Sequence, residues 1–151
     1  MDTDLRDLYQ EIILDHNKNP KNFHKLDPAS HSAEGYNPLC GDKINVYLQV
    51  EDGKIVDIGF EGSGCAISKA SASVMTTIVK NKTVEEVKAL FEKFKGLVTG
   101  KVEPDMLELG KLAVFAGVRD YPSRAKCATL SWHTVMAALN SKEEQAIVST
   151  E

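Results

Sequence analysis

Three cysteines and one aspartate are the residues whose types and spacing could do chemistry in this chain. Cys40 and Asp42 lie two residues apart in the segment Pro38–Asp42, and the other cysteines are Cys65 and Cys127. Three thiolates and one carboxylate can close a four-coordinate tetrahedral shell of the kind that zinc accepts. A carboxylate is a harder ligand than sulfur, so we expect Asp42 to make the metal more exchangeable.

The pattern between the first two cysteines predicts a β-hairpin that brings them together. Apolar residues alternate from Ile44 to Val50, and Asp52-Gly53 is typical of a tight hairpin turn. Cys40 precedes the first strand and Cys65 follows the second. Because the two strands are antiparallel, both cysteines are expected at the same end of the hairpin. The returning strand should place one set of side chains on its buried face: Val56, Ile58 and Phe60.

We expect Cys65 and Cys127 each to begin a helix. Unpaired N–H groups and the helix dipole at such a position favour a thiolate over a thiol. An odd number of cysteines in an apparently reducing compartment argues against a disulfide framework. Free cysteine is also among the most buried residue types, so plain burial stays open beside metal binding.

The elements that must position these residues predict an α+β fold. We expect a small antiparallel sheet of about three strands, with the third drawn from residues 26–37, and helices packed on one face. The chain should form a single domain over residues 1–151, with a frayed polar tail over 141–151. The helices are expected over Leu5–Asn17, Cys65–Lys80, Thr83–Gly96 with a capping box, and from Cys127 onward.

Composition excludes several classes of function. No apolar run approaches the roughly 18 to 20 residues of a membrane-spanning helix, so no membrane partner is expected. Eighteen basic residues against 22 acidic ones, with no basic cluster interleaved with aromatics, argue against nucleic acid. Met1–Asp4 is acidic where a secretory signal would be basic, so we expect a cytoplasmic protein.

Four segments of the sequence resemble the IscU/NifU amino-terminal family of iron–sulfur cluster assembly proteins. The likeness covers about residues 5–140, and the segments occur in the family's order: Asp15–Asn22, Asn37–Asp42, Phe60–Ser68 and Cys127–Trp132. The resemblance implies that the three cysteines are the family's site cysteines, with Asp42 beside the first. It also implies an IscU-like fold.

Three departures from the scaffold branch of the family, IscU proper, resemble the SufU branch. IscU has a histidine immediately before the third cysteine and a Leu-Pro-Pro-Val-Lys segment that an Hsp70-type chaperone binds. This chain has Lys126 and Val118–Arg124 there, and extra residues over Phe94–Leu109. Members of the SufU branch are similar to zinc proteins that accept persulfide sulfur from a SufS-type cysteine desulfurase.

The resemblance therefore implies a zinc-dependent sulfurtransferase. Cys40 is the expected sulfur acceptor because it lies on a Pro/Gly loop that can move, while the other ligands keep the metal. Arg124 could steady the thiolates or Asp42, or it could be an ordinary solvated arginine. A long loop is expected over Lys18–Pro38, and His24 or His31 on it could replace Asp42 as fourth ligand.

Two other functions stay open for the same residues. The cysteines could ligate iron, so the protein could be a scaffold that builds a [2Fe-2S] or [4Fe-4S] cluster and passes it to downstream iron–sulfur assembly machinery. A purely structural metal in a docking protein is the third hypothesis. Exposed Gly-rich loops around the cysteines fit it poorly, since structural zinc sites are usually closed.

Overall fold

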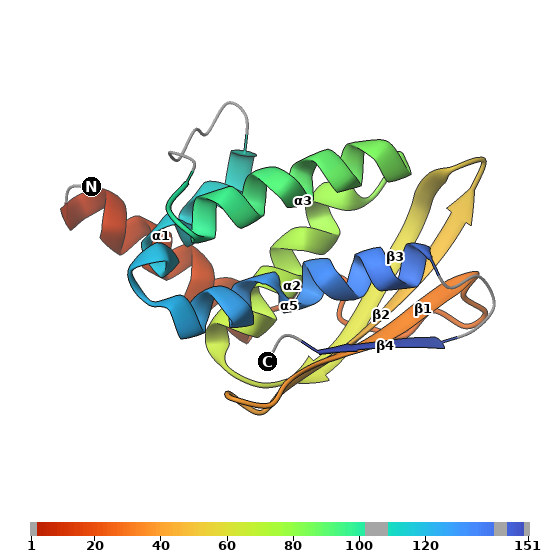
Figure 1. The fold of residues 1–151 in the computed structure, drawn as a ribbon, viewed down its shortest axis with the longest axis horizontal. Helices are drawn as coiled ribbons and strands as arrows, with labels where there is room; N and C mark the ends of the chain where they lie inside the picture. Colours follow the sequence, from red (N-terminus) through yellow and green to blue (C-terminus); the bar gives the residue numbers. More distant parts are fainter. Residues whose placement is uncertain (1–2, 102–108, 141–144, 150–151) are drawn as a thin grey trace.

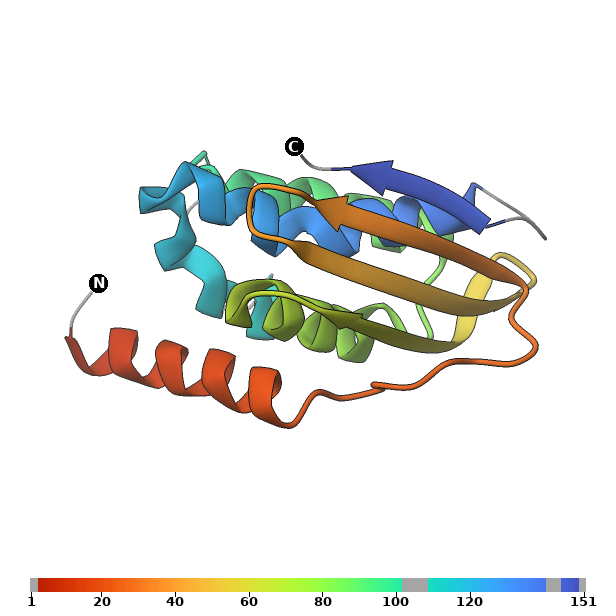
Figure 2. The same cartoon turned by 90° about the horizontal axis from the view of Figure 1, so that it is seen from below.

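The computed structural model describes residues 3–101, 109–140 and 145–149, and it confirms the α+β class (Figure 1). The strands form one sheet in the order β3-β2-β1-β4. Helices α2 and α5 pack on one face of this sheet, and α1 lies against α2 (Figure 2). The elements are α1 (Thr3–Lys18), β1 (His31–Asn37), β2 (Asp42–Glu51), β3 (Lys54–Ser63), α2 (Ala66–Val79), α3 (Val84–Val98), the 3-10 helix η1 (Gly110–Asp120), α5 (Pro122–Leu139) and β4 (Gln145–Ser149).

The predicted hairpin is confirmed as β2 and β3. Asp52 and Gly53 both have positive φ, at 53° and 74°, as a two-residue turn of the type I′ kind requires. Alternate residues of β2 are buried as expected. A register shift at Gln49/Val50 buries Ile55 in β3, where the sequence pattern had predicted Val56. The shift leaves Val56 without a partner in β2, and such an extra residue bends the strand and interrupts the ladder only locally.

The expected antiparallel strands are confirmed as β1, β2 and β3, and in the described part of the chain a fourth strand joins them. β1 lies within the predicted 26–37 region and pairs antiparallel with β2. The fourth strand, Gln145–Ser149, lies within the segment predicted to be a frayed tail and pairs parallel with β1. An edge strand gains order from main-chain hydrogen bonds to its neighbour, and a short tail segment does not by itself reveal that pairing. The rest of that predicted tail, 141–144 and 150–151, lies outside the described residues.

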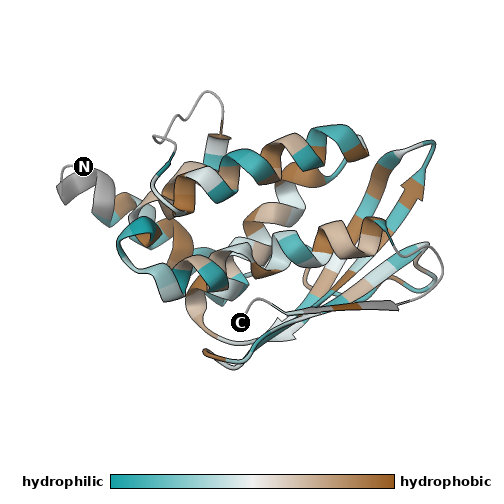
Figure 3. Ribbon diagram, viewed as in Figure 1, coloured by the Kyte–Doolittle hydropathy of each residue, from teal (hydrophilic) through white to brown (hydrophobic). Residues whose placement is uncertain are grey.

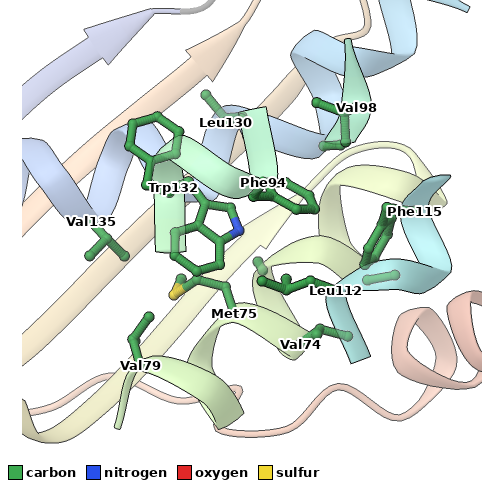
Figure 4. Packing of buried hydrophobic residues seen from close by; sticks show 14 of the residues in the cluster. Val74, Met75, Val79, Phe94, Val98, Leu112, Phe115, Leu130, Trp132 and Val135 are labelled. Atoms are coloured by element: carbon green, nitrogen blue, oxygen red, sulfur yellow. The ribbon is translucent and has the colours of Figure 1, made fainter. Parts of the chain in front are cut away.

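The core lies between the helices and against the sheet. Phe94 is at its centre, with its ring 5.6 Å from Trp132 and 5.8 Å, edge to face, from Phe115 (Figure 4). α3 shows alternating hydrophobic and hydrophilic stripes, typical of a helix with one buried face (Figure 3). Its predicted capping box at Thr83 and Glu86 is confirmed, but the helix continues past Gly96 to Val98. Buried Leu97 and Val98 explain that extension, because their packing outweighs the glycine.

The last helix begins earlier than predicted. α5 starts at Pro122, so Cys127 lies in its second turn and does not begin the helix. Proline suits a first helical position, where its missing N–H would have had no partner. The segment Arg119–Arg124 therefore consists of the end of a 3-10 helix at Asp120, one linking residue, and the first turn of α5.

The end of α1 is fastened to α2 by buried polar contacts. The ring Nδ1 of His16 lies 2.7 Å from Ser73 Oγ, which also accepts the Lys21 backbone N–H at 2.7 Å. Asn22 donates to Thr76 Oγ1 at 2.9 Å. These contacts hold the start of the long loop against the helix that follows Cys65.

Candidate metal centre

The turn between β1 and β2 brings Cys40 and Asp42 to a sulfur of the last helix. Cys40 lies in the turn, Asp42 is the first residue of β2, and Gly41 between them has a φ of 69° that glycine accepts without strain. Cys127 Sγ, from α5, lies 3.1 Å from Cys40 Sγ. One ligand atom from each of Cys40, Asp42 and Cys127 lies within 4.8 Å of the others.

Cys65 follows β3 at the same end of the hairpin as Cys40, and it approaches this group through Asp42. It is the N-cap of α2, as predicted, and its Sγ accepts the Ser68 backbone N–H at 3.4 Å. Its own backbone N–H donates to Asp42 Oδ1 at 2.8 Å, and its Sγ lies 3.8 Å from Asp42 Oδ2. Cys65 is not itself among the residues within 4.8 Å of one another, so Asp42 links it to the other sulfurs.

Two residues that sequence reasoning gave no role hold Asp42 and Cys127 in place. The Asn37 side chain is fully buried, and its Nδ2 donates to Asp42 Oδ2 and to Cys127 Sγ, both at 3.3 Å. Gly64 packs against Asp42 so closely that any side chain there would collide with the carboxylate. Asn37 pairs with Asp42 in the sheet, and that register is the signal that could have identified it.

The donor set fits a thiophilic divalent metal. Two sulfurs and a carboxylate already converge, and a third sulfur lies beside the carboxylate. Zinc accepts these ligand types in a four-coordinate shell. The four residues named from the sequence are thus placed together, and their metal-binding role remains a prediction.

A known family pattern matches most of this chain. The sequence pattern described as the NifU-like N-terminal domain matches residues 8–128. The chain belongs to this family. The family resemblance seen in the sequence is confirmed.

Similar proteins carry names from iron–sulfur cluster assembly. A Streptococcus pyogenes serotype M1 protein named iron–sulfur cluster assembly scaffold protein IscU is 40% identical over 135 residues, which is 89% of this chain and 84% of that protein. The zinc-dependent sulfurtransferase SufU of Bacillus subtilis strain 168 is 39% identical over 137 residues, 91% of this chain and 92% of its own. A crystal structure from Fervidobacterium islandicum AW-1, titled a putative iron–sulfur cluster assembly scaffold protein for the SUF system, has a TM-score of 0.81 and 38% identity, covering 89% of this chain and 98% of that one.

Burial changes the chemistry expected of Cys127 in this family member. The residue has no exposed surface, and burial raises the pKa of its thiol, with hydrogen bonds to Cys40, Asp42 and Cys65 adding to the effect. The predicted stabilisation of its thiolate by a helix N-terminus is therefore wrong. The N–H groups that would have provided it belong to residues nearer Pro122.

Arg124, one turn before Cys127 on α5, is brought to the sulfurs. A hydrogen bond with Cys127 raises the pKa of the Arg124 guanidinium, and electrostatic interactions with Cys65, Cys127 and Cys40 raise it further. The side chain is otherwise exposed. Arg124 therefore lies beside the sulfurs, and a role for it there remains a prediction.

Neither alternative histidine reaches the candidate centre. His31 begins β1 and pairs with Leu48, at the opposite end of that strand from Asn37. His24 lies against Gly59 in the middle of β3, with its ring Nδ1 3.3 Å from the Lys25 carbonyl oxygen. The suggestion that either could replace Asp42 is wrong in this structure, because His31 lies at the far end of β1 from Asp42 and His24 lies beside the middle of β3.

An apolar groove of about 580 Å³ opens beside Arg124. Its walls come from α1, the start of α2 and η1, and include Ile13, Ile67 and Val118. Tyr121, which links η1 to α5, borders it and is 64% exposed.

Among the helices that the structure describes, none combines the length and hydrophobicity needed to cross a bilayer.

Proposed function

We propose that this protein is a zinc-dependent sulfurtransferase that accepts persulfide sulfur from a SufS-type cysteine desulfurase for iron–sulfur cluster biogenesis. The placement of Cys40 carries the proposal: a partly exposed thiol in a turn, 3.1 Å from a fully buried thiol and beside a carboxylate. The likeness to the Bacillus subtilis zinc-dependent sulfurtransferase supports it.

Zinc would be held by Cys40, Asp42, Cys65 and Cys127, and when bound it would keep the cysteines deprotonated at neutral pH. Asp42 is suited to share a site with three sulfurs. Its Oδ1 is already occupied by the Cys65 N–H, so Oδ2 is the oxygen that faces the sulfurs. The buried Cys127 and the N-capping Cys65 are each tied to a helix, which suits them to stay in place.

Cys40 is the thiol best placed to accept sulfur. Its thiolate attacks the outer sulfur of the desulfurase persulfide, forming a new S–S bond. The original S–S bond breaks, and its electron pair leaves on the desulfurase cysteine as a thiolate. The product is a persulfide on Cys40, and no net oxidation or reduction occurs. Cys127 cannot make this attack from its buried position, because an incoming persulfide cannot reach it.

Arg124 would act beside the acceptor as an auxiliary residue. Its guanidinium is always protonated and lies against the sulfurs of the candidate centre. A persulfide on Cys40 is an anion, so this charge would favour the product as well as the thiolates. The apolar groove next to Arg124 offers a contact surface for the protein that delivers the sulfur.

A scaffold function is the second candidate, with an iron–sulfur cluster as cargo. The Streptococcus pyogenes relative named as a scaffold supports it, and the same sulfurs could ligate iron. Lys126 stands immediately before Cys127 where the scaffold branch has a histidine, which counts against this candidate.

One set of assays separates the two candidates. Zinc content is measured after aerobic purification, and desulfurase turnover is measured with saturating wild-type protein, Cys40→Ala and Leu39→Ala. Leu39→Ala changes the same turn without removing the thiol. We expect stoichiometric zinc and a large stimulation that only Cys40→Ala abolishes. Acquisition of a transferable iron–sulfur cluster with unchanged turnover would show that the sulfurtransferase proposal is wrong.

A further inference from the structure

We propose that Asn37 is a positioning residue that holds Asp42 and Cys127 together as metal ligands while Cys40 is free to leave. The inference rests on the proposed function, because that function requires zinc to stay bound during the departure of Cys40. The Asn37 side chain contacts the expected ligands Asp42 and Cys127 and does not act on Cys40, the sulfur that reacts.

The Asn37 side chain bridges two elements that are distant in the sequence. Its Nδ2 lies 3.3 Å from Asp42 Oδ2, five residues away, and 3.3 Å from Cys127 Sγ, 90 residues away. An amide nitrogen carries two hydrogens, so one group can donate to both acceptors at once. Asn37 thereby ties the start of β2 to the second turn of α5 without any contribution from Cys40.

The orientation of the amide follows from its neighbours. An ionised carboxylate only accepts hydrogen bonds, so the amide atom that faces Asp42 must be the nitrogen. The other atom, Oδ1, is buried and has no hydrogen-bond partner among the described residues. A buried acceptor without a partner lowers stability. The donors of Asn37, and not its acceptor, therefore account for an amide at this position.

The backbone of Asn37 makes a separate contact with the acceptor turn. Its carbonyl oxygen accepts the Cys40 backbone N–H at 3.3 Å, which closes the turn. Replacing the side chain leaves this contact possible. The effect of a substitution should therefore fall on Asp42 and Cys127, and the turn that carries Cys40 should keep its conformation.

The test measures metal binding by the full-length protein. Zinc affinity is determined by chelator competition for wild type, Asn37→Ala and the control Asn45→Ala. Asn45 has the same side chain as Asn37 but lies on the face of β2 opposite to that of Asp42. We expect Asn37→Ala to bind zinc about 10- to 100-fold more weakly, the usual effect of losing a hydrogen bond to a metal ligand. In a Cys40→Ala background the loss should be at least as large, since Asp42 and Cys127 then carry more of the binding.

A spectroscopic readout separates positioning from general stability. An N–H···S hydrogen bond stabilises the sulfur lone pairs, so its loss should move the thiolate charge-transfer band of the Co²⁺-substituted protein to lower energy. Asn45→Ala should leave the band unchanged. Wild-type affinity and an unshifted band in Asn37→Ala would overturn the positioning role.

A second variant covers the case in which Asn37→Ala does not fold, as judged by circular dichroism. Asn37→Ser keeps a hydroxyl that can donate to only one of the two acceptors, so its zinc affinity should lie between those of wild type and the expected alanine value. Wild-type affinity in Asn37→Ser overturns the inference. If the Asn37 variants bind zinc normally while wild type stimulates the desulfurase, only the positioning role fails. A wild type that binds no zinc overturns both proposals.

Discussion

Replacing Gly64 with alanine should disturb Asp42 and, through it, the whole candidate centre. Gly64 has a φ of 146°, a conformation that residues with a side chain rarely adopt. An added Cβ would collide with Asp42 Oδ1 and would lie 2.9 Å from Asp42 Cα and 3.0 Å from its Cβ. These neighbours are backbone or short side chain, so the carboxylate has to move away.

Two contributions set the size of the effect. Backbone strain at such a position costs about 1–3 kcal/mol. Displacing Asp42 also breaks the hydrogen bond from the Cys65 N–H to Oδ1, 2.8 Å long, and bonds to charged groups contribute about 1.5–3 kcal/mol. We therefore expect the free energy of unfolding of the metal-free protein to fall by about 3 kcal/mol or more. Zinc affinity should fall by about 10-fold or more, because Asp42 no longer faces the sulfurs.

Gly53→Ala is the matched control. Gly53 also has a left-handed φ, 74°, but no atom lies within 4 Å of an added Cβ, and the residue is in the hairpin turn at the far end of the strands. It should lose only about 1–2 kcal/mol and keep its zinc affinity. Urea unfolding measures the free energy of unfolding, and chelator competition measures the zinc affinity. If Gly64→Ala loses no more stability than Gly53→Ala and binds zinc as wild type does, the packing of Gly64 does not position Asp42.

Two further predictions concern stability away from the sulfurs. Burial lowers the pKa of His16, so the unfolded chain takes up a proton first as the pH falls below about 6.5 and stability declines there. Urea unfolding at pH 7.5 and pH 5.0 should show a smaller decline for His16→Asn, and an equal decline would contradict this assignment. Thr83→Ala removes one half of the α3 capping box and should cost about 1 kcal/mol in thermal unfolding. An unchanged melting temperature would mean that the cap contributes nothing.

Local patterns in the sequence were enough to predict much of the fold. The β2–β3 hairpin, its turn at Asp52-Gly53 and the capping box of α3 depend on residues within a few positions of one another. The placement of Cys40 and Cys65 at one end of that hairpin follows from strand geometry alone. The helix expected from Cys65 onward likewise predicts its position at the start of α2. The four candidate ligands were all identified at this level.

Contacts between distant segments decided the rest. β4 is ordered by pairing with β1, more than a hundred residues earlier, which the local sequence of the tail did not indicate. Cys127 is buried in the second turn of α5 and was expected at a helix start, because Pro122 begins the helix instead of preceding it.

Asn37 shows most clearly what the sequence by itself determined and what only the tertiary structure decided. The sequence placed it three residues before Cys40 in a segment that resembles a family motif. The packing of α5 onto β1 then brought its amide to Cys127, 90 residues away, and the sheet register brought the same amide to Asp42. Residue types and local spacing thus name the ligands. The hydrogen bonds that hold them in place depend on long-range packing, which no local pattern encodes.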